Sequence, residues 1–205
     1  MNHRILKVIV FATATLTLVV CSNKEHLVNS DETASIVSSS LVYGGQTYKT
    51  VVIGKQTWMA ENLNFKTSAG SWCYGGADSN CTIYGRLYNY DTAMTVCPVG
   101  WHLPGVAEWD TLEAVAGVNK LVNLKSKTMW KPKSGTDSLG FTALPGGYRD
   151  STIYLYGGEF GYWWTATSSG KSDAFSRNMY FTGVGVFHGL SLQSYGFSVR
   201  CLKNS

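Results

Sequence analysis

The stretch VCPVGWHLPGVAEWDTLEAVA (residues 96–116) decides the fold, because it joins a cysteine to an amphipathic helix. Its apolar side chains recur every three to four residues and share one side of that helix: Val106, Trp109, Leu112 and Ala116. The acidic side chains lie elsewhere: Glu108, Asp110 and Glu113. A helix is therefore predicted over residues 106–116, with Gly105 as a tolerable N-cap. A shorter helix is predicted upstream, over residues 89–96.

Short strands are predicted on both sides of this stretch. Upstream, QTYKTVVI (46–53) and QTWMA (56–60) are rich in β-formers and are separated by Gly54-Lys55, a pair that suits a type II′ hairpin. Glycine supplies 22 of 205 residues, which favours turns and short strands over long helices. Downstream, further strands are predicted over residues 141–144, 162–167, 174–181, 185–188 and 197–202.

Four of the five cysteines lie in this Gly- and aromatic-rich body and permit three disulfide pairings. Cys73 and Cys81 flank a run of turn residues, WCYGGADSNC (72–81), so a local bridge is predicted between them. Cys97 then pairs with Cys201, which alternation places on the apolar, buried side of the last strand. The alternative is a four-cysteine zinc site, but the chain has no C-x-x-C pair and its spacings do not fit one. Two disulfides indicate an extracytoplasmic protein.

The N-terminus is typical of an export signal. Arg4 and Lys7 precede thirteen uncharged residues, 8–20, which are too few to span a bilayer comfortably. The run ends in LVVC (18–21), which resembles the lipobox of bacterial lipoproteins, where cleavage frees a cysteine for acylation. Val20 departs from that pattern, since a small residue normally stands there. Lipidation of Cys21 is predicted; secretion after ATA (12–14) and an uncleaved anchor are the alternatives, and all three export the body of the chain.

The predicted organisation is a signal peptide over 1–20, a flexible tether over 21–40 and a folded domain over 41–205. Residues 22–40 are Ser-rich and polar, so they cannot bury enough apolar surface to fold alone. All seven Trp and all twelve Tyr follow residue 40, which suits one domain with one core. Without the two cations of the signal peptide, the formal charge falls from +4 to +2. There is no basic stripe, so nucleic acid is not expected as a partner.

Seven blocks of this sequence together resemble the Fibrobacter succinogenes major paralogous domain family, in the family's order and over nearly all of residues 43–203. The blocks are QTWMAENLN (56–64), WCYGG (72–76), NCTIYGRLYNYDTAM (80–94), VCPVGWHLPGVAEWDTL (96–112), GFTALPGGYRD (140–150), YWWTATS (162–168) and YGFSVRCLK (195–203). More distantly, the family is similar to the C-type-lectin-like fold of the formylglycine-generating and sulfatase-modifying group.

The resemblance implies a compact α+β domain of the C-type-lectin-like kind. Short antiparallel strands would place the N- and C-terminal strands in one sheet, two helices would flank it, and a long Gly-rich loop region would follow. Leu103-Pro104 with Glu108-Trp109, and Gly196-Phe197 with Arg200, carry this distant likeness. Position 105 departs from the family, where Ser or Thr often caps the helix, but Gly costs only a few tenths of a kcal/mol there. The family implies little chemistry.

No catalytic constellation is found in the sequence. The formylglycine-generating group uses a reactive cysteine pair, whereas each domain cysteine here has a predicted disulfide partner. His102 and His188 have no G-x-S-x-G serine to activate. We interpret His102 as a hydrogen-bonded core residue and His188 as a solvated loop residue, and we expect no enzymatic activity.

The charged residues indicate neither a metal site nor a cofactor. The loop carboxylates follow no EF-hand series and no lectin calcium signature: Asp78, Asp137, Asp150 and Glu159. Arg86 and Arg200 are interpreted as partners of nearby carboxylates. We therefore expect no metal ion and no cofactor.

Four residues form the candidate ligand-binding site. Trp163 and Trp164 are adjacent in a predicted strand and face opposite sides, so only one can belong fully to the core. Tyr148 and Arg149 lie in a Gly-flanked segment together with further tyrosines, a mixture that stacks on sugar rings or grips a protein partner. The alternative for each tryptophan is core filling beneath the loops.

The sequence thus predicts an exported, lipid-anchored module for adhesion or recognition at the cell envelope. Its partners would be the membrane, through a lipid on Cys21, and a glycan or protein ligand. A structural envelope or assembly subunit is the second hypothesis, and a degenerate enzyme of the sulfatase-modifying type is the third. The sequence names neither the ligand nor the membrane that holds the anchor.

Overall fold

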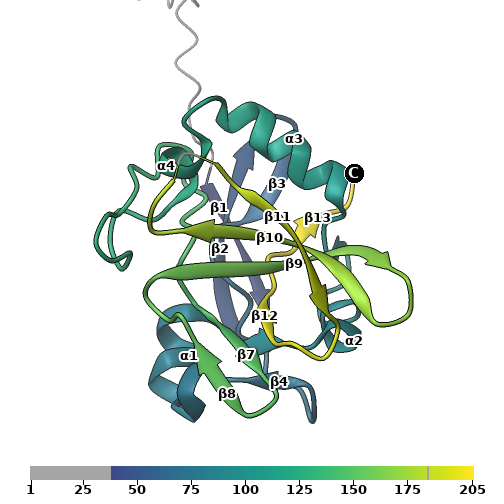
Figure 1. The fold of residues 1–205 in the computed structure, drawn as a ribbon. Coiled ribbons are helices and arrows are strands. Elements are labelled where there is room, and N and C mark those ends of the chain that lie inside the picture. The colour runs from purple at the N-terminus through teal and green to yellow at the C-terminus, as the bar shows by residue number, and fades with distance from the viewer. Residues whose placement is uncertain (1–37, 184) are drawn as a thin grey trace, which may run out of the picture. The chain divides into compact units, whose positions relative to one another are not determined.

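The computed structural model describes residues 38–183 and 185–205 (Figure 1). The predicted signal peptide, Cys21 and tether residues 21–37 lie outside this part of the chain. Strand β1, Ser38–Tyr43, begins three residues before the predicted domain boundary at residue 41. Its pairing with β2, Gln46–Ile53, accounts for the earlier start, because the register already sets Ser38 opposite Val51.

The first sheet has five strands in the order β1-β2-β3-β13-β6. The predicted hairpin of β2 and β3 is confirmed, with Ile53 opposite Gln56 and a positive φ of 61° at Gly54. β13 pairs with β3 through Leu202 and Trp58, so the N- and C-terminal strands share a sheet as expected. Beyond β1 and β2, the members are β3 (Gln56–Met59), β13 (Leu202–Lys203) and β6 (Trp101–His102).

The second sheet has six strands in the order β11-β10-β9-β12-β5-β4. They are β11 (Phe187–Leu192), β10 (Asp173–Tyr180), β9 (Phe160–Ser169), β12 (Phe197–Ser198), β5 (Leu87–Tyr88) and β4 (Ser71–Trp72). Neighbouring strands are antiparallel, except that β12 runs parallel to β9. A separate hairpin of β7 (Tyr148–Asp150) and β8 (Ile153–Leu155) contacts this region through a bridge between Arg149 and Gly196.

Within the described ranges the chain forms four α-helices and one 3₁₀ helix. They are η1 (Tyr74–Gly76), α1 (Asp78–Tyr84), α2 (Tyr90–Ala93), α3 (Val106–Ala116) and α4 (Lys120–Leu124). α3 has the predicted bounds, and α2 is a shorter form of the predicted helix over 89–96. The prediction of only two helices is wrong. Asp78 occupies the first turn of α1, where a carboxylate favours the helix N-terminus, so the predicted loop there is helical instead.

Residues 197–202 form two short strands in place of the single predicted one. β12 belongs to the second sheet and β13 to the first, and residues 199–201 cross between them. Along the crossing, Leu63 N–H donates to the Val199 carbonyl at 2.9 Å and Met59 N–H to the Cys201 carbonyl at 3.0 Å. The predicted strand over 141–144 reduces to one bridge between Lys125 and Ala143, and the strand over 185–188 is shifted to β11.

The core consists of two clusters on the two sides of β9. Trp163 belongs to one cluster, in which its ring lies 6.2 Å from that of Trp109. Trp164 belongs to the other and stacks on Phe197 at 4.3 Å. Both tryptophans have 0% of their surface exposed, so the prediction that only one belongs fully to the core is wrong. The sheet is covered on both faces, and both alternating sets of side chains are therefore buried.

Both predicted disulfides are present. Cys73 bonds to Cys81 across 8 residues, and Cys97 bonds to Cys201 across 104 residues. The long bridge ties the segment after α2 to the crossing between the two sheets. Disulfides of this kind indicate an extracytoplasmic protein. None of the helices in residues 38–183 and 185–205 has the length and apolar character needed to span a membrane.

Candidate functional site

The two predicted tryptophans cannot contact a ligand in this structure. The Trp163 indole N–H donates to Asn62 Oδ1 at 2.9 Å, and the Trp164 indole N–H donates to the Tyr88 carbonyl at 2.7 Å. With their rings buried and their polar atoms paired, both residues hold the sheet together. The sequence failed to show this because adjacent residues in a strand face opposite sides, and only tertiary packing decides whether both sides are covered.

Tyr148 is half-buried in β7 and belongs to a continuous row of aromatic rings. We call this set the aromatic row: Tyr195, Tyr148, Tyr156, Phe160, Tyr180 and Phe187. Successive ring centroids along it are 5.5, 6.0, 4.7, 4.7 and 4.5 Å apart. Every member keeps part of its surface in solvent, up to 47% for Tyr156 and 44% for Phe187.

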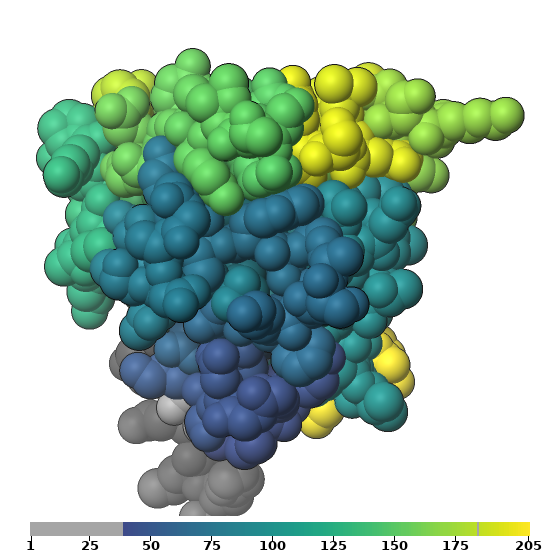
Figure 2. All heavy atoms as spheres, turned by 90° about the horizontal axis from the view of Figure 1, so that it is seen from below, coloured from purple at the N-terminus to yellow at the C-terminus, as the bar shows by residue number. Residues whose placement is uncertain are grey.

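Strand register builds the row from distant parts of the sequence. Tyr180 of β10 lies opposite Phe160 of β9, and Phe187 of β11 lies opposite Asn178, two residues away on the same face of β10. The β7–β8 hairpin then adds Tyr148. Figure 2 shows this hairpin region, in green, beside the yellow segment near the C-terminus, in agreement with the Arg149–Gly196 bridge.

Neutral polar groups accompany the row on the β10–β11 face. The Ser176 hydroxyl donates to Asn178 Oδ1 at 3.1 Å and lies 3.4 Å from the Ser191 hydroxyl. Gly189 leaves the room that these side chains need, since a Cβ there would lie 2.6 Å from the Asn178 amide and the Ser176 hydroxyl. Ser176 and Asn178 are buried, so of these three polar residues only Ser191 keeps part of its surface in solvent beside the aromatic row.

Arg149 points away from the aromatic row, on the opposite side of β7. Its guanidinium lies 4.0 Å above the Trp72 ring centroid, and Tyr154, its cross-strand neighbour, contacts Tyr74 at 5.6 Å. The structure therefore separates the predicted pair: Tyr148 joins the aromatic row, whereas Arg149 joins a cluster around Trp72. Neither residue lies with Trp163 or Trp164 on a common exposed surface.

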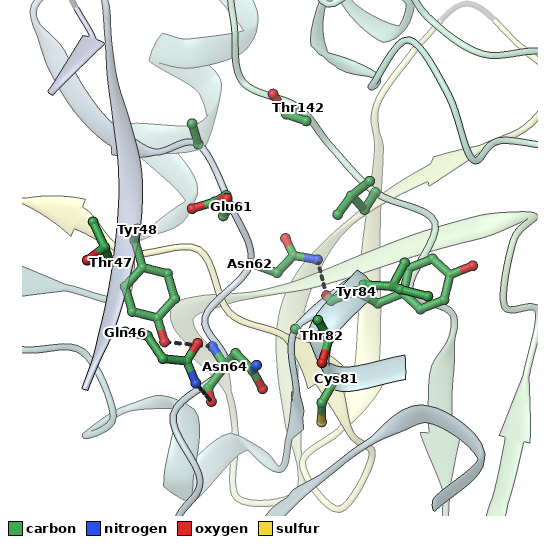
Figure 3. A pocket seen from close by; sticks show the side chains of 14 residues that line it. Gln46, Thr47, Tyr48, Glu61, Asn62, Asn64, Cys81, Thr82, Tyr84 and Thr142 are labelled. Carbon is green, nitrogen blue, oxygen red and sulfur yellow. Dashed lines mark hydrogen bonds between the residues drawn. The ribbon is translucent and has the colours of Figure 1, made fainter. Parts of the chain in front are cut away.

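A polar groove is the second candidate site (Figure 3). The polar groove consists of two adjoining hollows, of about 190 Å³ and about 360 Å³. Both hollows share Gln46, Asn64, Cys81 and Thr82 in their walls. The start of β2, the segment after β3 and helix α1 supply these walls, so the groove depends on the Cys73–Cys81 bridge that fixes α1.

Backbone and amide groups fix the shape of the groove. Figure 3 shows the Gln46 amide donating to the Asn64 carbonyl at 3.2 Å, and Asn64 N–H donating to the Tyr48 hydroxyl at 3.2 Å. The Asn62 amide donates to the Tyr84 carbonyl at 2.8 Å. Because these contacts span 16 to 22 residues, no local pattern in the sequence indicates the groove.

The two arginines expected to pair with carboxylates do not do so in the described part of the chain. Arg86 has no carboxylate within 4.0 Å, and its buried Nε has no hydrogen-bond partner there. Arg200 is fully buried and donates to neutral oxygens only, among them Asn62 Oδ1 at 2.7 Å. Burial lowers the pKa of Arg200 to about 9, which leaves it charged at neutral pH.

A third cluster, which sequence reasoning missed, joins α3 to β10 and β11. One ligand atom from each of Asp110, Glu113 and His188 lies within 4.8 Å of the others, and these residue types can hold a metal ion. Arg177 already pairs with Asp110 at 2.7 Å and with Glu113 at 3.1 Å, and Lys120 pairs with Glu113 at 2.6 Å. A cation would have to displace these partners, so the geometry favours an ion-pair network.

The two histidines lie in different settings from those predicted. His102 is hydrogen-bonded as expected, to Glu108 at 2.8 Å and Asn204 at 2.7 Å, but its side chain is 38% exposed because β6 is an edge strand. His188 is exposed as expected, yet it lies inside β11 and reaches Glu113 at 3.3 Å.

The family model of the Fibrobacter succinogenes major domain matches residues 51–203. The chain belongs to this family. No curated protein and no solved structure matches it. The match covers the aromatic row, both disulfides and the polar groove except for its wall at the start of β2.

Proposed function

We propose that this member of the Fibrobacter succinogenes major domain family is an exported, lipid-anchored binding module that recognises a glycan at the cell envelope. The observation that carries the proposal is the aromatic row. Each of its six rings lies next to the following one, and all six are partly exposed to solvent. Sugar rings present C–H faces to aromatic side chains and hydroxyls to neutral polar groups. The exposed Phe187 ring and the partly exposed Ser191 lie on the same face of β11.

The fold proposed for the module is C-type-lectin-like. Three features support it: the N- and C-terminal strands share a sheet, a disulfide joins Cys97 to Cys201, and helix α3 begins shortly after Leu103-Pro104. All four cysteines of the described domain are in disulfides, which supports binding over thiol chemistry.

A glycan array probed with the full chain tests the proposed function. We expect retention of one glycan class, and at least a tenfold loss of binding in Tyr156→Ala and Phe187→Ala, because these are the most exposed rings of the row. Val118→Ala, an exposed apolar side chain after α3, is the matched control and should bind as the native chain does. Absence of glycan binding, or equal binding by all variants, would contradict the proposal.

The proposed anchor is tested by the intact mass of the membrane-extracted protein. We expect the mass of a chain that begins at Cys21 and carries acyl groups, together with a gain of four hydrogen atoms on reduction of the two disulfides. Cys21→Ser should remove the acyl mass. An unacylated native chain would show that the lipid anchor is wrong while leaving export intact.

A structural envelope subunit is the second candidate function, and edge strand β11 favours it. β11 exposes Leu190 and Leu192 and has no proline and no Lys, Arg, Asp or Glu to protect its free edge. Such an edge can pair with a strand of another protein. Co-purification of one fixed envelope protein, lost in Leu190→Lys and accompanied by no glycan binding, would favour this function.

A further inference from the structure

We propose that the polar groove binds a uronic acid, a sugar residue that carries a carboxylate; this inference rests on the glycan-binding function proposed above and names the class of sugar. The two hollows of the groove, about 190 and 360 Å³, are in the range of sites for one small molecule. They have room for a single sugar residue. Extended chains would have to continue onto the surface outside.

Arg86 supplies the group that selects a carboxylate. Its side chain makes no hydrogen bond or ion pair with any described residue, although its Nε is buried. A buried donor without a partner is costly, and a planar guanidinium matches a carboxylate with two parallel hydrogen bonds. Lys66 lines the same hollow and adds a second cation, whereas Asp78 is the one carboxylate there. Over both hollows Glu61 and Asp78 balance the two cations, so the hollow beside Arg86, with two cations and one carboxylate, is the part of the groove that favours an anion.

The backbone conformation at Gly85 positions Arg86 beside the groove. Gly85, between α1 and Arg86, has a positive φ of 75°, and a Cβ there would lie 2.7 Å from Asn62. Only glycine allows the backbone to pass Asn62 so closely. Arg86 N–H then donates to the Leu63 carbonyl at 2.9 Å, which fixes the start of its side chain beside the groove.

The rest of the groove matches sugar hydroxyls and a sugar ring. Asn64 Oδ1 is buried and has no partner among the described residues, and either end of its amide complements a hydroxyl, which both donates and accepts. Glu61 uses Oε2 to accept from Lys49 N–H at 2.8 Å, and its other oxygen can accept from a hydroxyl. The half-buried rings of Phe65 and Tyr84 provide apolar wall for the C–H face of the sugar.

Titration of the full chain with D-glucuronate and D-galacturonate tests the inference, with D-glucose, D-galactose and acetate as comparison probes. Binding is followed by calorimetry or by NMR. We expect a uronate to bind at least tenfold more tightly than its neutral counterpart and than acetate. Equal affinity for uronate and neutral sugar would overturn the carboxylate assignment, and equal affinity for acetate would overturn the sugar assignment.

Variants locate the binding in the groove. Arg86→Gln should weaken uronate binding at least tenfold. Asn64→Asp should also weaken it, because the new carboxylate would repel that of the uronate. Two independent substitutions thus test the same groove. Lys127→Gln, an exposed lysine outside the groove, is the matched control and should not change it. Thermal unfolding of each variant reports whether the fold survives. Unchanged binding in folded Arg86→Gln would overturn the inference.

The outcomes separate this inference from the proposed function. If glycans bind through the aromatic row, with loss in Tyr156→Ala, while uronates fail to bind, the uronate site is wrong and the proposed function stands. If uronate monosaccharides bind with dependence on Arg86 while Tyr156→Ala has no effect on any glycan, the groove is confirmed and the aromatic row is not the binding surface. If no sugar binds, both are wrong.

Discussion

Arg200 shows how one buried charge organises the centre of the molecule. Its guanidinium donates to Asn62 Oδ1 through Nε at 3.2 Å and through a terminal nitrogen at 2.7 Å. It also donates to the carbonyls of Met59, Phe141 and Thr142. These acceptors come from two separate segments, so Arg200 links the crossing between the sheets, on which it lies, to the end of β3 and to the loop before β7.

Replacing Arg200 should therefore destabilise the fold severely. Arg200→Met should lower the free energy of unfolding by about 3–5 kcal/mol, because three backbone carbonyls lose this donor and Asn62 Oδ1 keeps only the Trp163 indole N–H. Arg200→Lys should recover little, since an ammonium lacks the planar set of donors. Denaturant unfolding at neutral pH measures both. A loss below about 1 kcal/mol in Arg200→Met would show that the neighbours find other partners.

Lys125 is a buried amine whose stability effect depends on pH. Its ammonium donates to the carbonyls of Lys133, Tyr180 and Phe181 at 3.0 to 3.4 Å and lies 4.3 Å from the Trp130 ring centroid. Burial lowers its pKa from 10.5 to about 8. The folded chain thus releases this proton at a lower pH than the unfolded chain does.

Unfolding free energy should consequently rise between pH 8 and pH 10. In that window the unfolded state binds more protons at this site, so stability increases by about 1 kcal/mol per pH unit. Above pH 10 the sign reverses, because burial raises the pKa of Tyr88 and Tyr162 and the unfolded state releases those protons first. Denaturant titrations from pH 7 to 11 measure the profile. Lys125→Met should remove the rise between pH 8 and pH 9, whereas the lowered pKa of Arg200 still contributes a rise above pH 9. A rise between pH 8 and pH 9 that persists in this variant would assign it to other groups.

At the scale of elements, α3 is held to the second sheet by a buried ion-pair network. Glu113, which the helical pattern placed away from the apolar side, is buried and accepts from Arg177 of β10 at 3.1 Å. Arg177 is itself fully buried and also reaches Asp110 and the Val106 carbonyl. Helix packing here therefore depends on charge as well as on the apolar stripe.

Glu113→Gln should detach part of this network and lower stability by about 3 kcal/mol, because Arg177 would keep a buried charge with only a half-exposed partner. Glu108→Gln is the matched control on the same helix. Its pair with His102 is more than a third exposed, so a change of at most about 1 kcal/mol is expected. Thermal or denaturant unfolding compares the two. Equal effects would argue against the special role of the buried pair.

At the scale of the whole molecule, the chain closes on itself through the crossing at residues 199–201. Cys201, the last residue of this crossing, is bonded to Cys97, and β13 then enters the sheet that β1 and β2 began. The long bridge thus links the C-terminal strands to the segment between α2 and α3. The short bridge acts only on η1 and α1, beside the polar groove.

Removing the two bridges separately should give unequal losses. The chain-entropy relation predicts about 4.7 kcal/mol for Cys97→Ala with Cys201→Ala and about 2.5 kcal/mol for Cys73→Ala with Cys81→Ala. Reversible denaturant unfolding of the two double variants measures the difference. A larger loss for the short bridge would mean that the native environment of α1, rather than loop length, sets the stabilisation.

The sequence by itself determined the features that depend on local spacing. The apolar repeat of residues 106–116 gave α3 its bounds, the Gly54-Lys55 pair gave the β2–β3 hairpin, and the separation of the four domain cysteines gave both disulfides. The helix and the hairpin depend on the conformations of neighbouring residues, and the disulfides follow from the number and spacing of the cysteines. The family could be recognised for the same reason, since its motifs are contiguous blocks.

Only the tertiary structure decided which polar and aromatic groups are buried and which face solvent. Trp163 and Trp164 are both buried because separate clusters cover the two faces of β9, whereas Tyr148 and Arg149 lie on opposite sides of one strand. The aromatic row and the polar groove each join residues of different elements that lie far apart in the sequence. Strand register and sheet crossing set these contacts, and neither is specified by the spacing of residues along a single segment.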